Sequence, residues 1–186
     1  SALSSCYSCG RGTKAEAGSA KCASCDAGES GTGVGGTCQQ CAAGQSRASN
    51  DDTTDSCTPC NTGYYQKDLG QASCLPCIPG EYQNVTGAES CHKCPENTFT
   101  NISGLSVCYS CSRGTKAELG SATCTKCDAG EAGIGINGTC DVCQAGRYRT
   151  SGMSATLCLE CPIGFSQSDS GQASCTKCSP GEFNVV

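Results

Sequence analysis

Short groups of apolar residues, separated by polar stretches, follow a pattern along this chain that repeats every 16 to 19 residues. Cysteines mark the period, because they fall only in Cys-x-x-Cys pairs, and a glycine usually follows the second cysteine after three residues. An aromatic residue often comes two positions later, at Tyr65, Tyr82, Phe99, Tyr148 and Phe183. A polar stretch, often with a second glycine, leads to the next pair. This unit is too short for a helix with its connections, and it predicts short extended segments joined by tight turns.

The glycine after each cysteine pair predicts a left-handed turn. It is present in ten of the eleven units, and Asn97 takes its place in the other. Asn is the residue that best tolerates a left-handed backbone after Gly. We therefore expect φ > 0 at this position, and we expect the aromatic rings to pack over a neighbouring cystine as a very small core.

A longer repeat lies above the short one. Residues 3–29 are identical to residues 105–131 at 21 of 27 positions, an offset of 102 residues or six units. We therefore predict two super-repeats, residues 1–107 with an incomplete leading unit and residues 108–186 with an incomplete end. Because both ends cut through a unit, we expect the chain to be a fragment of a longer array.

Composition rules out a conventional hydrophobic core. Leu, Ile, Val and Phe make up about 11% of the 186 residues, a level at which chains without other support stay disordered. Cysteine accounts for 22 residues, about 12%, which is above the level that marks a disulfide scaffold. Cross-links or metal must therefore supply the order that burial cannot.

Charge and hydropathy exclude several classes of function. A net charge of −5 and few basic residues give no footprint for nucleic acid. No apolar run approaches the roughly 18 residues of a membrane span, so we expect no membrane contact from this segment. The single histidine, His92, has no second histidine to work with, and we expect it to be an ordinary exposed residue. We expect no cofactor and no enzyme activity.

Three chemistries use Cys-x-x-Cys pairs: disulfides, structural zinc and redox motifs. Zinc sites need two pairs about 15–20 residues apart, whereas the intervals here are 12 to 15 residues. Redox motifs occur singly at the start of a helix, a setting that this chain lacks. Three Asn-x-Ser/Thr sequons, at Asn84, Asn101 and Asn137, favour secretion and predict N-glycans. Disulfides are the favoured interpretation, and zinc remains the alternative.

The disulfide pairing follows from loop closure. The second cysteine of one pair and the first of the next enclose a loop that closes as a hairpin, and each closure stabilises the fold by about 3 kcal/mol in the chain-entropy account. Cys6 and Cys178 would then pair beyond the chain. The alternative joins first to first and second to second cysteines, as in Cys6–Cys22 with Cys9–Cys25. The favoured bridges are Cys9–Cys22, Cys25–Cys38, Cys41–Cys57, Cys60–Cys74, Cys77–Cys91, Cys94–Cys108, Cys111–Cys124, Cys127–Cys140, Cys143–Cys158 and Cys161–Cys175.

The unit resembles a known family. Cys-x-x-Cys-x-x-Gly-x-Tyr followed by Gly-x-x-x-Cys, as in residues 74–91, is similar to the ephrin-receptor-like cysteine-rich repeat. It also resembles the first loop of tumour-necrosis-factor-receptor modules and, more loosely, EGF-like domains. The resemblance spans the whole chain and implies extracellular, disulfide-linked, elongated arrays, found in receptors, adhesins and surface coats, including many long protist proteins. It implies no enzyme activity.

Two other patterns suggest ligand sites but have simpler interpretations. Residues 31–36 and 133–138 fit Gly-x-Gly-x-x-Gly, yet they lie inside loops bounded by cysteines, without the strand and helix of a dinucleotide site. A flexible or closely packed loop is the better interpretation. Asp51, Asp52 and Asp55 could hold calcium through oxygen ligands, but the second super-repeat has no carboxylate there, so a solvated acidic loop is favoured.

These observations predict a small disulfide-rich fold, an elongated, rod-like tandem array of short β-hairpin units with little regular secondary structure. We expect each unit to contact only its neighbours. The leading functional hypothesis is a structural glycoprotein segment of an extracellular filament, stalk or surface coat, as in a flagellar hair, with copies of itself or other filament or coat proteins as partners. The alternative is an adhesin or receptor ectodomain that binds a protein ligand. Either hypothesis places the chain at the cell surface or in secreted material.

Overall fold

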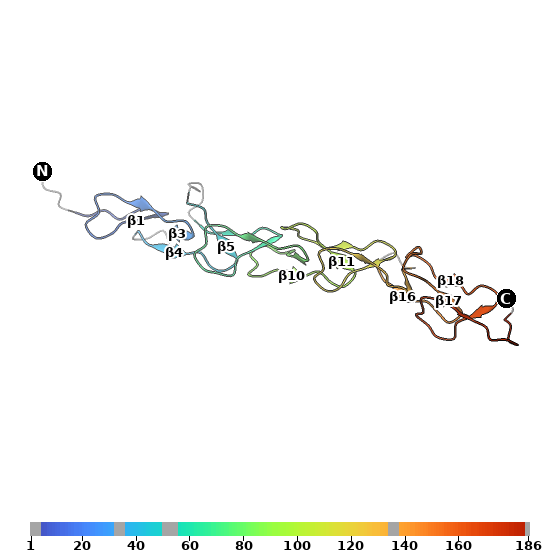
Figure 1. The fold of residues 1–186 in the computed structure, drawn as a ribbon. Helices are drawn as coiled ribbons and strands as arrows, with labels where there is room; N and C mark the ends of the chain where they lie inside the picture. The colour runs from blue at the N-terminus through green and yellow to red at the C-terminus, as the bar shows by residue number, and fades with distance from the viewer. Residues whose placement is uncertain (1–4, 32–35, 50–55, 134–137, 185–186) are drawn as a thin grey trace. The chain divides into compact units, whose positions relative to one another are not determined.

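The computed structural model describes residues 5–31, 36–49, 56–133 and 138–184. In these ranges the chain forms ten two-stranded antiparallel sheets, and no helix is present there. Each sheet is a hairpin of two successive strands, such as β3 and β4 in Figure 1. We number the hairpins 1 to 10. The predicted class, a small disulfide-rich array of β-hairpins, is confirmed.

The strands are two or three residues long, because each lies between a turn and a cysteine. Their bounds are β1 Thr13–Lys14, β2 Ala23–Ser24, β3 Glu29–Gly31, β4 Cys38–Gln40, β5 Gln45–Ser46, β6 Thr58–Pro59, β7 Tyr64–Tyr65, β8 Leu75–Pro76, β9 Glu81–Tyr82, β10 His92–Lys93, β11 Thr98–Phe99, β12 Tyr109–Ser110, β13 Thr115–Lys116, β14 Thr125–Lys126, β15 Glu131–Ala132, β16 Asp141–Val142, β17 Arg147–Tyr148, β18 Leu159–Glu160, β19 Phe165–Ser166 and β20 Thr176–Lys177.

Contacts divide the chain into two compact units whose residues alternate in the middle of the sequence. Unit 1 comprises Ser1–Ile78, Tyr82–His92 and Ser103–Val107, and unit 2 comprises Pro79–Glu81, Lys93–Ile102 and Cys108–Val186.

The turn before each first strand has the left-handed backbone that the sequence predicts. Asn97, the one residue that replaces glycine there, has φ 62° and is the only non-glycine residue with positive φ in the described ranges. The glycines at this position share that sign, with Gly63 at 83° and Gly146 at 78°. The second glycine of the unit is also left-handed, as in Gly70 and Gly104. The positive-φ prediction is confirmed.

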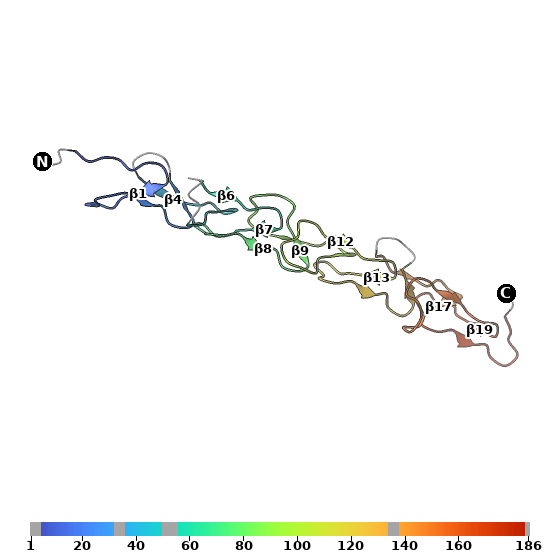
Figure 2. The same ribbon diagram turned by 90° about the horizontal axis from the view of Figure 1, so that it is seen from above.

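Main-chain hydrogen bonds join one hairpin to the next. In unit 1 four such bonds connect hairpin 4, which contains β7 and β8 (Figure 2), with hairpin 5. The same four positions connect hairpins 9 and 10 in unit 2. Because only backbone atoms take part, the junction tolerates the varied side chains of the repeat. The bonds, from N–H to carbonyl, are Gly63 to Gln83, Gln66 to Ala88, Cys77 to Gly63 and Gly87 to Cys60, and Gly146 to Gln167, Arg149 to Gln172, Cys161 to Gly146 and Gly171 to Cys143.

Some hairpins also contact the next hairpin but one along the chain. The expectation that each unit contacts only its neighbours is therefore wrong. A Cβ on Gly28 in hairpin 2 would lie 2.0 Å from the carbonyl oxygen of Gly70 in hairpin 4. In unit 2, a Cβ on Gly130 in hairpin 8 would lie 2.0 Å from the carbonyl oxygen of Gly171 in hairpin 10. The absence of a side chain at the turn lets the backbone of a third hairpin approach this closely.

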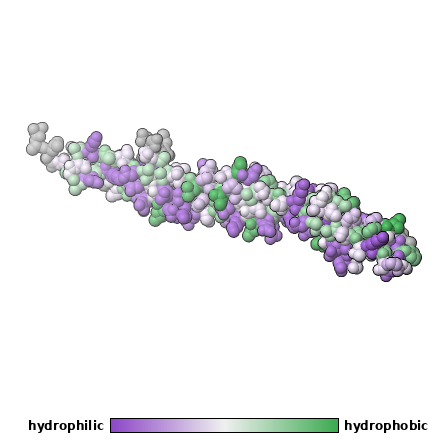
Figure 3. Space-filling model, in the orientation of Figure 1, coloured by the Kyte–Doolittle hydropathy of each residue, from purple (hydrophilic) through white to green (hydrophobic). Residues whose placement is uncertain are grey.

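The core consists largely of sulfur and polar groups. The second cysteine of each pair is buried through most of the chain, with Cys77 and Cys94 fully enclosed. The sixth residue after that cysteine, here called the framework position, is also buried in most hairpins although it is usually polar. Hydrophilic and hydrophobic residues are interspersed on the face shown in Figure 3. The buried framework residues are Gly31, Arg47, Gln66, Gln83, Thr100, Ala117, Gly133 and Arg149.

Aromatic rings lie against the residue across the hairpin. The ring centroids of Tyr82 and His92 are 5.9 Å apart, and those of Phe99 and Tyr109 are 6.3 Å apart. Phe99 and Tyr109 are register partners in their sheet. His92 is exposed, as expected, and serves as a packing partner of Tyr82.

Candidate functional site

The structure contains ten disulfides, each closing one hairpin. They have the second-to-first pairing that the loop argument favours, with Cα–Cα distances of 5.5 to 5.8 Å. Cys6 and Cys178 are unpaired. The bridges are Cys9–Cys22, Cys25–Cys38, Cys41–Cys57, Cys60–Cys74, Cys77–Cys91, Cys94–Cys108, Cys111–Cys124, Cys127–Cys140, Cys143–Cys158 and Cys161–Cys175.

The other sites suggested by the sequence lie only partly within the described residues. Asn84 and Asn101 are exposed, whereas Asn137 lies outside the described residues. The possible calcium ligands Asp51, Asp52 and Asp55 also lie outside them. Among the described residues, no cluster of three or more His, Cys, Asp or Glu side chains is placed to hold a metal ion.

The ends of the Gly-x-Gly-x-x-Gly loops are packed closely against the preceding hairpin. A Cβ on Gly31 would lie 2.1 Å from the main-chain nitrogen of Gly12, and a Cβ on Gly36 would lie 2.7 Å from the Cβ of Cys9. Gly133 and Gly138 make the corresponding contacts in the second super-repeat. These glycines are therefore needed for backbone packing, as the closely packed loop predicts.

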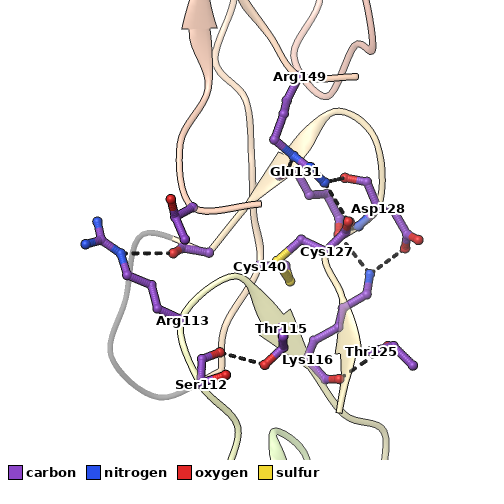
Figure 4. Close-up of a disulfide and its surroundings, with 12 residues drawn as sticks. Ser112, Arg113, Thr115, Lys116, Thr125, Cys127, Asp128, Glu131, Cys140 and Arg149 are labelled. Carbon is purple, nitrogen blue, oxygen red and sulfur yellow. Dashed lines mark hydrogen bonds and ion pairs between the residues drawn. A yellow bond between two sulfur atoms is a disulfide. The ribbon is translucent and has the colours of Figure 1, made fainter. Parts of the chain in front are cut away.

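A group of charged side chains, connected by ion pairs and hydrogen bonds, joins hairpins 7, 8 and 9. We call Lys116, Asp128, Glu131 and Arg149 the Lys116 cluster (Figure 4). Lys116 in β13 extends to the turn of hairpin 8, where its Nζ lies 2.6 Å from Asp128 Oδ2 and 2.8 Å from Glu131 Oε2. The turn holds both carboxylates on one side because they stand one and four residues after Cys127.

Arg149 approaches the same turn from hairpin 9. Its side chain is 1% exposed, and its Nη2 donates to the main-chain carbonyls of Cys127 and Asp128, both at 2.5 Å. Its Nε donates to the carbonyl of Glu131. A buried guanidinium is normally paired with an anion. Here main-chain carbonyl oxygens accept its hydrogen bonds, and the Asp128 carboxylate adds a favourable charge nearby.

The same arrangement recurs 102 residues earlier in unit 1. We call Lys14, Asp26, Glu29 and Arg47 the Lys14 cluster. Lys14 Nζ lies 2.5 Å from Asp26 Oδ2 and 3.1 Å from Glu29 Oε2. Arg47, which is 5% exposed, donates from Nη1 to the carbonyl of Glu29 at 2.9 Å. The super-repeat is therefore present in the side-chain contacts as well as in the sequence, with one cluster across hairpins 1–3 and one across hairpins 7–9.

Electrostatics favours the ionised forms of Lys14, Lys116 and Asp128. The hydrogen bond from Lys116 lowers the pKa of Asp128 below its usual value, and the nearby positive charges act in the same direction. Hydrogen bonds to Asp128 and Glu131 raise the pKa of Lys116, and those to Asp26 and Glu29 raise the pKa of Lys14. Each cluster has two cations and two carboxylates, so it is neutral as a whole.

The ionisation of Lys116 and Asp128 favours ion pairing over formation of a covalent bond between them. Condensation of a lysine amine with a neighbouring carboxyl group would need the neutral amine and the protonated acid. The pKa shifts of Lys116 and Asp128 favour the opposite forms. The carboxylate side chain of Asp128 is also 74% exposed to water. The Lys116 cluster therefore joins hairpins by ion pairs and hydrogen bonds.

The framework position is the feature that the sequence interpretation missed. Gln83 donates from Nε2 to the carbonyl of Ser90 at 2.7 Å and accepts from the amide of Val85 at 3.0 Å, which closes the loop between them. Gln66 and Gln167 make equivalent bonds. The available signal was Gln recurring six residues after a cysteine pair, with Arg at the same place 102 residues apart.

A comparison with protein families supports this description. The family model described as tyrosine-protein kinase ephrin type A/B receptor-like matches residues 48–80 and 70–107. Residues 48–107 are therefore similar to the ephrin-receptor-like cysteine-rich repeat. No significant match was found among curated proteins. The matched repeat type is generally non-enzymatic.

The cysteine-rich repeats and the ten disulfides indicate an extracellular or cell-surface domain stabilised by cross-links. Over the part of the chain that the structure describes, no helix is long and apolar enough to span a membrane.

Proposed function

We propose that this chain is a structural segment of an extracellular filament, stalk or surface coat. The observation that carries the proposal is the recurrence, after 102 residues, of a junction cluster with the same four residue types, the same two lysine ion pairs and an arginine hydrogen bond to the glutamate carbonyl. The recurrence makes two stretches of the chain structurally equivalent, so that one kind of contact between identical copies is available at both. The partners are copies of this chain or other filament or coat proteins.

The cross-linking supports the same role. Every described hairpin is closed by its own disulfide, and main-chain hydrogen bonds join it to the next. Local opening of one hairpin therefore leaves its neighbours covalently closed. A segment built in this way keeps its structure outside the cell without a large hydrophobic core.

Electron microscopy of the native material, isolated from its source without reductant, tests the proposal. We expect regular filaments or layers whose repeat is commensurate with one six-hairpin super-repeat. Separate, unassembled chains at the concentration found in the source would overturn the proposal. They would instead support an adhesin or receptor ectodomain, and a protein ligand would be sought next.

A further inference from the structure

Two of the three sequons occupy one structural position. Asn84 and Asn101 are both the seventh residue after the second cysteine of a pair, directly after the buried framework residues Gln83 and Thr100. Both asparagines are exposed, and so are Thr86 and Ser103, the hydroxyl residues that complete the sequons.

The fold accepts a large substituent at this position. Ala48, Lys67 and Glu118 stand at the same place in other hairpins, and all three are exposed. The hydrogen bonds that close the loop of hairpin 5 involve the side chain of Gln83 and the main chain of Val85 and Ser90, so the Asn84 side chain is not needed for packing. A sugar on its amide would displace only water.

We propose that Asn84 and Asn101 carry N-linked oligosaccharides that keep hairpins 5 and 6 out of contacts between copies of the chain. In the modification the Asn Nδ2 forms a bond to the anomeric carbon of an oligosaccharide held on a lipid pyrophosphate. The bond from that carbon to the pyrophosphate oxygen breaks, and the amide loses a proton. The shielding role rests on the proposed assembly of copies.

The distribution of charge along the sequence also supports keeping hairpins 5 and 6 out of contacts between copies. Residues 48–107 contain seven Asp and Glu residues but only two Lys, so this stretch carries a net charge of −5, equal to that of the whole chain. Like charges on neighbouring copies repel. The middle residue of each sequon is apolar and exposed, with Val85 55% and Ile102 58% exposed. An attached sugar would cover them. In chain order this stretch lies between the two neutral clusters.

Mass spectrometry of native material tests the modification. Release of N-glycans by an amidase in heavy-oxygen water should label Asn84 and Asn101 as heavy Asp. In a eukaryotic secretion system, Thr86→Ala and Ser103→Ala should each remove one glycan. The matched changes Thr86→Ser and Ser103→Thr should keep it, because they preserve the sequon. Unmodified Asn84 and Asn101 in native protein with its disulfides formed would overturn the inference and leave the filament proposal standing.

Enzymatic deglycosylation of native filaments tests the shielding. We expect closer lateral association, seen as increased light scattering and bundling in micrographs, with mock-treated filaments as the control. Filaments that lose both glycans and keep their spacing and scattering would contradict the shielding role. Glycosylated chains that form no filaments would instead overturn the proposed function.

Discussion

The turn glycine Gly63 lies directly against the backbone of Gly104, so that a Cβ on Gly63 would fall 2.1 Å from the Gly104 carbonyl oxygen. Gly63 belongs to hairpin 4 and Gly104 to hairpin 6. The amide of Gly104 also donates to the carbonyl of Cys77 in hairpin 5. This contact explains why glycine is needed here for two separate reasons, a positive φ and the space that a third hairpin occupies.

The first prediction separates these two reasons. Gly63→Ala should open the contact with Gly104, whereas Gly146→Ala should add only backbone strain of about 1–2 kcal/mol, because nothing lies within 4 Å of that position. Hydrogen exchange read at the Gly104 amide for Gly63→Ala, and at the Gly171 amide for Gly146→Ala, measures the difference. The larger loss of protection should follow Gly63→Ala. Equal losses of protection in the two variants would mean that the contact between Gly63 and Gly104 does not add to stability.

The second prediction concerns the buried framework glutamines. Gln83→Met keeps the size of the side chain but leaves the Ser90 carbonyl and Val85 amide without their partner, which should destabilise the loop by about 1–3 kcal/mol. Gln167→Met is the matched control, because Gln167 makes the same two bonds in a more exposed setting. Exchange of the Val85 and Asp169 amides measures both effects. A larger loss of protection at Asp169 than at Val85 would contradict the idea that burial of the glutamine strengthens its stabilising effect on the loop.

The third prediction uses two arginines of one hairpin. Arg149→Met removes buried hydrogen bonds from a charged donor and should weaken the junction between hairpins 8 and 9 by about 2–3 kcal/mol. Arg147→Met removes only an exposed ion pair with Glu160, worth about 0–1 kcal/mol. Protection of the Cys143 amide, which donates to Gly130, reports on the junction. Similar protection in both variants would refute a clamping role for Arg149.

Much of the backbone was predictable because glycine and cysteine constrain it locally. The positive φ at Gly63 and Asn97 follows from residue type and spacing, and the hairpin follows from two turns between paired cysteines. The contact between Gly63 and Gly104 could not be predicted in this way, since it depends on how far successive hairpins overlap. No local pattern specifies that overlap.

The side-chain clusters were harder to predict than the backbone. Lys116, Asp128 and Glu131 stand in a polar sequence, where charged residues usually indicate a solvated surface, and only the fold brings them together. Arg149 is buried against carbonyl groups, which carry no sequence signature. The repetition of these residues after 102 positions was the available signal, but identity between repeats does not reveal which side chains meet.

The fourth prediction is the disulfide connectivity in native protein. Peptides from digestion without reductant should link Cys60 with Cys74 and Cys77 with Cys91, because each pair closes one hairpin. Alkylation at acid pH before digestion prevents exchange during handling. Peptides that link Cys60 with Cys77 would show pairing of second cysteines. Those that link Cys57 with Cys74 would show pairing of first cysteines. Either result would contradict the hairpin array.

The fifth prediction is the pH dependence of the junction between hairpins 7 and 8. Because the pKa of Asp128 is lowered in the folded chain, its contribution to stability is present above the unfolded value of about 3.9 and is lost as the pH falls through the folded value. The pKa of Lys116 is raised, so its contribution is present below about 10.4 and is lost as the pH rises through the folded value. The junction should therefore be most stable between about pH 4 and 10.

Protection of the Cys127 amide, which donates to Gly114 across this junction, measures that dependence. After correction for the intrinsic exchange rate, protection should fall as the pH drops below about 4. Lys116→Met should remove most of the fall, since it removes the hydrogen bond that lowers the Asp128 pKa. The Cys77 amide, at a junction joined by backbone bonds, is the internal control. If Cys77 and Cys127 lose protection in parallel, the ion pairs do not stabilise the junction and the cluster is only a surface feature.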